Sequence, residues 1–260
     1  MIIGLLQCDH VLSEHRVIAT GDYDAIYAGV LMSAKSRMGL SIPIQIQSFA
    51  VVDGFFPKSP SLCEAWIVSS SKFNAFSSIG WISRLRDFVS RIIESGLPIA
   101  GICFGHQIIS LAMGGRVSRR PDWIVGVQEI YFSHNAWIKA PRVKLLGIHR
   151  DEVIEPPSNA TVIGSTEQVR IAAYIVTPNV LCIQYHMELN AGYVRALMET
   201  RKEMIGRDVC ERAIIGLQTP TDDKQISSSI LSFLLSNVNC PDVDAGLVDV
   251  SKNENKYSKE

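Results

Sequence analysis

The stretch PIAGICFGHQII, residues 98–109, changes from strand to helix character inside a Gly-x-Cys-x-Gly motif. The apolar run that ends at Ile102 suits a buried strand, and helical periodicity begins directly after Cys103. A side chain on so sharp a turn projects from the end of a sheet, where a nucleophile is useful. The helix N-terminus favours a thiolate, and Gly101 and Gly105 let a substrate approach the backbone. Cys103 is therefore a candidate nucleophile; the competing interpretation is a buried cysteine in a tight turn.

In the first half of the chain, short β-rich runs alternate with runs of helical periodicity. This rhythm predicts an α/β fold with an open, mostly parallel sheet and helices on both faces. Ligands of such sheets bind outside the carboxyl ends of the strands, and Cys103 lies at one of these ends. The expected strands are residues 2–7, 42–52, 65–69 and 97–102, and the expected helices are residues 23–38, 79–95 and 104–113.

The second half of the chain is richer in strands. Its last two β-type runs are separated by Thr177-Pro178-Asn179, which suits a hairpin turn. Since 260 residues with 47% hydrophobic content can bury one large core, we expect a single domain over 1–240 with this added β-rich second half. The polar, charged segment 241–260 is expected to be a disordered tail. The further expected strands are residues 125–132, 143–148, 161–164, 170–176 and 180–185, and the further expected helices are residues 191–205 and 223–235.

The composition argues against two classes of partner. The formal net charge is −1 and no face or stripe of Lys and Arg is visible, so the usual electrostatic footprint for nucleic acid is missing. The apolar N-terminus lacks a basic region and reads as a first buried strand, not as a signal peptide. The longest apolar stretch, 96–115, contains Pro98 and His106 and makes a poor membrane span. We expect neither nucleic acid nor a membrane as a partner.

Six cysteines are scattered along the chain without Cys-x-x-Cys spacing. In a chain of this length, the pattern argues against a zinc site or a disulfide scaffold and for a reducing cytoplasm. A metal hydrolase built on His149, Asp151 and Glu152 is a weak alternative, because ligands this close in sequence rarely suffice. No other histidine cluster supports them. We therefore expect no metal and no cofactor.

A thiol nucleophile needs a base, and the base needs a group that orients it. Of six histidines, His186 is the best placed, because it follows the apolar strand that ends at Tyr185. Glu188 comes two residues later, and residues two apart in extended backbone share a face, so its carboxylate can meet the imidazole. The alternative is an ordinary polar strand exit. Together with the Cys103 turn, the pattern favours a Cys-His-Glu triad.

The motif GICFGHQ at 101–107, followed far downstream by QYHME at 184–188, resembles class I glutamine amidotransferases. The likeness is strongest to stand-alone members that are similar to the amidotransferase half of GMP synthase. It covers about residues 65–189 and includes the segment HRDEV at 149–153. The resemblance implies the flavodoxin-like fold of that family and a small-molecule substrate, either glutamine or another γ-glutamyl compound.

Carried over by position, the resemblance implies a role for each member of the triad. Cys103 would attack the γ-carboxamide of glutamine and form a γ-glutamyl thioester. His186 would take the thiol proton, pass one to the departing ammonia and then activate water. Glu188 would hold the imidazole tautomer. His106, one position away from both functional neighbours, reads as a structural helix residue.

The resemblance also implies substrate contacts. The oxyanion would be met by the N–H of Phe104 and by one from the loop after residues 65–68, at about Ser70. Gln107 would contact the bound glutamine. Met187 stands where the family has a proline between His and Glu, and we expect this to loosen the site. Ser70 stands where relatives have a glycine that can turn its N–H toward the substrate, so we expect a less efficient enzyme.

Three functions remain open. The favoured one is a cytoplasmic enzyme that hydrolyses glutamine, or transfers its amide nitrogen, through a cysteine thioester. No ATP-binding motif or second catalytic domain is visible, so any acceptor of the ammonia would be a separate synthetase or other protein. The first alternative is a γ-glutamyl peptidase that uses the same triad on γ-glutamyl peptides or conjugates. The second is a weakly active or inactive homologue with a binding or regulatory role.

Overall fold

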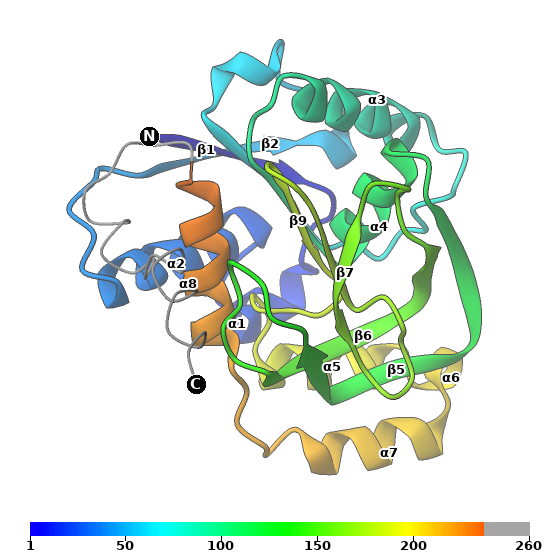
Figure 1. Cartoon of the computed structure of the whole chain (residues 1–260). Coiled ribbons are helices and arrows are strands. Elements are labelled where there is room, and N and C mark those ends of the chain that lie inside the picture. The colour runs from blue at the N-terminus through cyan, green and yellow to red at the C-terminus, as the bar shows by residue number, and fades with distance from the viewer. Residues whose placement is uncertain (237–260) are drawn as a thin grey trace, which may run out of the picture.

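Five parallel strands form one half of a nine-stranded sheet, in the order β2-β1-β3-β4-β9 (Figure 1). The computed structural model describes residues 1–236, so the disorder expected for 241–260 lies outside the described residues. Both faces of these strands are covered, and β3, β4 and β9 are buried along their whole length. The parallel strands are β1 (Ile2–Gln7), β2 (Gln45–Ala50), β3 (Ala65–Val68), β4 (Ile99–Ile102) and β9 (Val180–Ile183).

Helices cover both faces of the sheet, as the sequence predicts (Figure 1). They are α1 (Arg16–Ala19), α2 (Tyr23–Arg37), α3 (Gly80–Glu94), α4 (Phe104–Ala112), α5 (Ala191–Thr200), α6 (Lys202–Ile205), α7 (Arg207–Gly216) and α8 (Asp223–Leu234). Ile82 of α3 and Ile108 of α4 share one hydrophobic cluster with Trp66 of β3. Tyr27 of α2 and Ile230 of α8 belong to the cluster on the opposite face. Within residues 1–236, no helix has both the length and the apolar character needed to cross a membrane.

The other half of the sheet is antiparallel and continues outward from β9. Its strands, in spatial order, are β8 (Ala173–Val176), β7 (Thr161–Ser165), β5 (Arg116–Phe132) and β6 (Arg142–Glu155). The turn at 177–179 joins β8 to β9 as expected, with Val176 paired to Val180. β5 and β6 are longer than the expected strands. The sequence predicts shorter ones because the outer part of this hairpin is polar and contains Pro121. A register shift between Arg119 and Ile124 accommodates this part of the hairpin.

The chain beyond β9 bends twice where the sequence predicts one helix over residues 191–205. Arg201 separates α5 from α6, and Gly206, with φ 104°, separates α6 from α7. Helix α7 is not predicted from the sequence, since Cys210 is its one buried residue and the hydrophobic pattern there is weak. These bends bring Arg201 and Met204 to the wall of a cavity that Cys103 also lines.

Candidate active site

Cys103 occupies a strained turn between β4 and α4. Its dihedral angles, φ 52° and ψ −101°, lie in a region that residues with a side chain rarely adopt. Its N–H donates to the carbonyl of Ile183 on β9 at 2.9 Å, and its carbonyl accepts from the N–H of Gln107 at 3.2 Å. Such strain costs about 1–3 kcal/mol and persists where the surrounding structure over-determines it. The turn therefore holds the Cys103 side chain at the carboxyl end of β4.

The two glycines beside Cys103 allow close packing of the backbone. A Cβ added at Gly105 would lie 2.2 Å from the carbonyl oxygen of Val68, and one at Gly101 would lie 2.6 Å from the backbone of Gly105. Neither glycine has a positive φ. They let α4 sit directly against β3 and β4, which fixes the direction of the turn. The access for a substrate that we expected at these glycines stays a prediction.

His186 and Glu188 lie together just beyond the end of β9. Nδ1 of His186 is 2.8 Å from Oε1 of Glu188, and both residues are buried. The N–H of His186 donates to the carbonyl of Leu146 on β6 at 2.9 Å. Met187, where we expected a looser chain, is only 2% exposed. The bond to Leu146 and the burial of Met187 thus fix this stretch of backbone, although it contains no proline.

Burial opposes the charged forms of His186 and Glu188, but each residue stabilises the charge of the other. Against that burial, the charges of Glu188 and Cys103 raise the pKa of His186 to about 10. Burial also opposes ionisation of Glu188, yet the charge of His186 and hydrogen bonds from His186 and Ser70 hold its pKa below the usual value. At neutral pH His186 is therefore protonated and Glu188 is ionised.

Ser70 supports the carboxylate and does not line the cavity. Its Oγ donates to Oε1 of Glu188 at 2.6 Å, and its backbone N–H is directed at the hydroxyl of Tyr27 on α2 at 3.4 Å. The oxyanion role expected for Ser70 is therefore corrected, because its N–H is engaged elsewhere. Ser71 lines the cavity in its place, and its N–H has no hydrogen-bond acceptor among residues 1–236. Phe104, the first residue of α4, also lines the cavity.

The cavity in front of Cys103 encloses about 260 Å³ and includes Gln107 in its wall. Nε2 of Gln107 donates to the carbonyl of Asp151 at 2.8 Å and to Oε1 of Gln184 at 3.1 Å. The Gln107 amide oxygen is left to accept a bond from a ligand. Nε2 of Gln184 lies 3.5 Å from Sγ of Cys103. Gln184 belongs to the QYHME motif, but the sequence alone assigns it no role.

Two further buried histidines, His106 and His149, are uncharged at neutral pH. Burial lowers the pKa of His106 and of His149 to about 3. His106 packs on Tyr174 with ring centroids 5.0 Å apart, which agrees with the structural role expected for it. His149 packs edge-on against Tyr185, lines the cavity, and its ring nitrogens have no hydrogen-bond partner among residues 1–236.

The structure does not bring the weak metal-site candidate together as a ligand set. Asp151 binds Arg119 through both oxygens, at 2.8 and 3.1 Å, while Glu152 binds Arg120 at 2.9 Å. In the described part of the chain, no three His, Cys, Asp or Glu side chains are placed to hold a metal ion.

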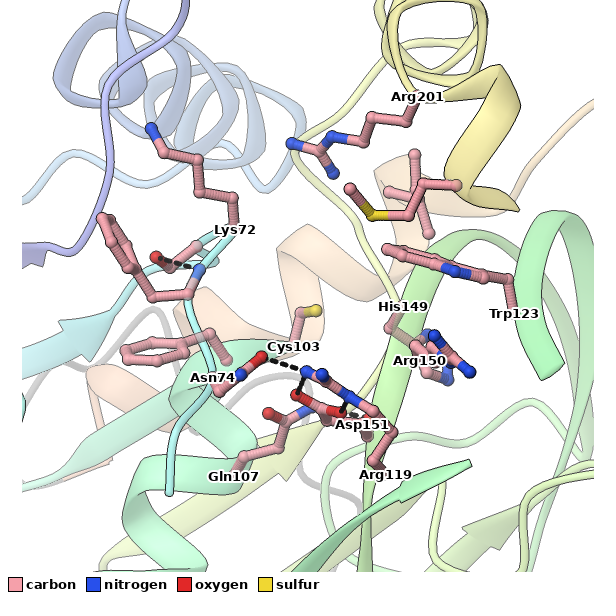
Figure 2. A pocket seen from close by; sticks show the side chains of 15 residues that line it. Lys72, Asn74, Cys103, Gln107, Arg119, Trp123, His149, Arg150, Asp151 and Arg201 are labelled. Atoms are coloured by element: carbon pink, nitrogen blue, oxygen red, sulfur yellow. Dashed lines mark hydrogen bonds and ion pairs between the residues drawn. The ribbon is translucent and has the colours of Figure 1, made fainter. Parts of the chain in front are cut away.

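The rim of the cavity is not predicted by the sequence pattern. Figure 2 shows side chains from β5, β6 and the bends after α5 reaching around Cys103. The cavity is lined by Arg119, Trp123, Arg201 and Met204. From the sequence, Arg119 is expected to be a solvated charge and Trp123 an ordinary packing residue. No periodicity signals such a rim, because its members come from segments that meet only in the folded chain.

Comparisons with known proteins point to one family. A family model described as "Glutamine amidotransferase class-I" matches residues 73–199. The chain is 34% identical over 157 residues to "Gamma-glutamyl peptidase 4" of Arabidopsis thaliana, covering 56% of this chain and 62% of that protein. It is 31% identical over 176 residues to "Gamma-glutamyl peptidase 2" of the same plant, covering 64% and 71%. A solved glutamine amidotransferase from Methylobacillus flagellatus superimposes with a TM-score of 0.67 at 16% identity, covering 91% of this chain and 94% of that one.

Proposed function

The chain belongs to the class I glutamine amidotransferase family, and on that premise we propose that it hydrolyses a γ-glutamyl amide bond. In this proposal Cys103 is the nucleophile, His186 carries the proton and Glu188 orients His186. The observation that supports it best is the buried contact of 2.8 Å between His186 and Glu188, beside the strained turn that presents Cys103.

The first half-reaction forms a thioester and releases an amine. Sγ of Cys103 attacks the γ-carbonyl carbon as a thiolate, while the proton it gave up resides on His186. The C–S bond forms and the carbonyl electron pair moves onto oxygen. When the tetrahedral intermediate collapses, the C–N bond breaks and Nε2 of His186 gives its proton to the leaving nitrogen. The raised pKa of His186 and its unpartnered Nε2 support this role.

The second half-reaction returns the enzyme to its starting state. Neutral His186 takes a proton from water, the resulting hydroxide oxygen bonds to the thioester carbon, and the C–S bond breaks. Glutamate leaves, and the proton on His186 again faces the Cys103 thiolate. Through both steps Glu188 accepts the bond from Nδ1, which keeps Nε2 available for proton transfer.

The oxyanion of both intermediates would be held by backbone donors. The N–H of Phe104 has no carbonyl four residues earlier within its helix, and the N–H of Ser71 is without an acceptor among the described residues. The amide oxygen of Gln107 would accept a bond from the α-ammonium group of the γ-glutamyl unit. Ser70 would act indirectly, through its hydrogen bond to Glu188.

The identity of the leaving amine separates two candidate functions. Ammonia would make the chain a glutaminase or amidotransferase, with a separate synthetase or other protein as acceptor. An amino acid or peptide would make it a γ-glutamyl peptidase, and the guanidinium of Arg201 in the cavity wall favours this second candidate. The five cysteines in the described residues are all unpaired, which supports a reducing compartment, and we place the chain in the cytoplasm.

One assay panel tests the proposal. Purified protein is incubated with glutamine, γ-glutamyl dipeptides and asparagine, and glutamate and ammonia are measured against a Cys103→Ser control. We expect glutamate from a γ-glutamyl compound, none from the control and no turnover of asparagine. Release of ammonia and glutamate from glutamine alone selects the glutaminase. Absence of glutamate from every substrate supports the regulatory homologue.

A further inference from the structure

The two ends of the cavity carry different charge. Figure 2 shows Asp151, Arg119 and Gln107 on one side of Cys103 and Arg201 on the other side. The first end holds a carboxylate and a guanidinium in contact, at 2.8 and 3.1 Å. The Arg201 end holds a cation without a carboxylate beside it in the described residues. A ligand that spans the cavity would therefore meet mixed charge at one end and positive charge at the other.

Most cations of the cavity are already occupied. Lys72 forms an ion pair with Asp9 at 2.6 Å, and Arg119 is bound to Asp151. Arg150 donates to the carbonyls of Arg120 and Pro121. The guanidinium of Arg201 has no hydrogen-bond or ion-pair partner among residues 1–236. It is held at the cavity wall by the break between α5 and α6, not by a protein anion.

The surroundings of Arg201 are apolar. Met204, one turn further on, and Trp123 of β5 line the same wall, and Figure 2 shows Trp123 between Arg201 and Arg150. The indole N–H of Trp123 is buried without an acceptor among the described residues. An unpaired guanidinium beside apolar walls and a free N–H suits a carboxylate with a short side chain attached.

The charges of the possible substrates match these two ends. The γ-glutamyl unit carries an ammonium and a carboxylate, which fit the mixed end at Asp151 and Arg119. Ammonia as a leaving group adds nothing for Arg201 to bind, whereas an amino acid adds a carboxylate on the far side of the scissile bond. We propose that Arg201 binds the carboxylate of the leaving amine, so that γ-glutamyl amino acids and peptides are preferred over glutamine. This inference rests on the proposed hydrolysis at Cys103 and names its substrate class.

A matched pair of substrates tests the proposal. γ-Glutamyl-alanine and γ-glutamyl-alaninamide differ in the carboxylate that Arg201 would bind, and glutamine lacks the whole residue. We would measure kcat/KM by glutamate release for the wild type, Arg201→Gln, Arg201→Lys and Arg212→Gln. Arg212 is the matched control, because it is exposed on α7 and outside the cavity lining. Thermal melting checks that each variant folds.

We expect the wild type to prefer the acid over the amide by about tenfold to hundredfold, mainly through KM, since a charged hydrogen bond has this strength. In Arg201→Gln the acid-to-amide ratio falls toward one, Arg201→Lys keeps part of it, and Arg212→Gln keeps the wild-type ratio. If Arg201 instead binds the α-carboxylate of the γ-glutamyl unit, Arg201→Gln lowers kcat/KM equally for the acid and the amide. An unchanged acid-to-amide ratio therefore overturns this inference but leaves the proposed hydrolysis intact. No glutamate from any of the three substrates overturns the proposed function as well.

Discussion

The floor of the cavity is made by backbone packing, whereas its rim is made by side chains from distant segments. On the floor, Gly105 lies against the carbonyl of Val68, and Cys103 is held in a strained turn by a hydrogen bond to Ile183. On the rim, Trp123 comes from β5 and Met204 from α6. Close contacts with the backbone of Val68 leave no room for a side chain at Gly105, whereas Met204 on the rim is largely exposed. If the proposed function holds, the reaction type would be set by the floor and the choice of substrate by the rim.

The largest effect is expected from a methyl group added at the floor of the cavity. In Gly105→Ala the new Cβ meets backbone atoms of Val68 at 2.2 Å, which cannot move without separating α4 from β3. We expect the free energy of unfolding to fall by about 3 kcal/mol or more. Gly29→Ala is the matched control, because nothing lies within 4 Å of its Cβ in helix α2, and it should gain about 0.5–1 kcal/mol. Urea denaturation measures both.

Urea denaturation of a rim variant provides the comparison with Gly105→Ala. Met204 is 64% exposed, so Met204→Ala should change stability by no more than about 0.5 kcal/mol. If Gly105→Ala is as mild as Met204→Ala, the floor is not sterically fixed and the contrast between floor and rim is wrong.

A smaller effect is expected from the residue that supports the triad. Ser70→Ala removes the donor at 2.6 Å from Glu188 and leaves a buried carboxylate with one hydrogen bond fewer. We expect kcat to fall about tenfold to hundredfold with little change in KM, because Ser70 does not line the cavity. Ser33→Ala, which removes an exposed hydroxyl bonded to Arg37 on α2, is the control and should leave kcat unaltered. A rise in KM at constant kcat would instead place Ser70 in substrate binding.

The smallest effect concerns the dependence of stability on pH. Burial lowers the pKa of His149 from 6.5 in the unfolded chain to about 3 in the folded protein. Below pH 6.5 the unfolded chain therefore binds a proton at His149 that the folded protein does not bind. Wild-type stability should therefore fall relative to His149→Gln by up to about 1.4 kcal/mol per pH unit from pH 6 downward. His186 has the opposite sign, since its stabilising proton is fully present below pH 6.5 and is lost toward pH 10. Thermal melting at pH 7 and pH 5 measures this effect. If the stability difference between wild type and His149→Gln is the same at both pH values, the assignment of a neutral, buried His149 is wrong.

The floor could be predicted from sequence because its signals are local. The change of periodicity at Cys103 gives the turn, and the two-residue spacing of His186 and Glu188 gives their contact. The physical reason for Gly105 was not visible, since Val68 lies far away in the chain. The role of Ser70 was misjudged because its direction depends on Tyr27, a contact across more than forty positions.

The rim could not be predicted from the pattern of residues. Arg119 looks like solvated charge in a polar stretch, and only the β5–β6 hairpin shows that it meets Asp151. Arg201 lies inside what reads as one continuous helix, so neither the break nor the unpaired guanidinium leaves a local signal. Long-range pairing, not propensity, decides these positions.

In the proposed mechanism Cys103 forms a covalent bond to the γ-glutamyl carbonyl with the help of His186. The most direct test is peptide mapping by mass spectrometry after treatment with diazo-oxo-norleucine, an electrophile for glutamine sites, in wild type, Cys103→Ala and His186→Gln. We predict an adduct on Cys103 of the wild type that forms in step with loss of glutamate release, none in Cys103→Ala, and much slower labelling in His186→Gln. Labelling of another residue with activity lost, or equal glutamate release by wild type and Cys103→Ala, would contradict the account.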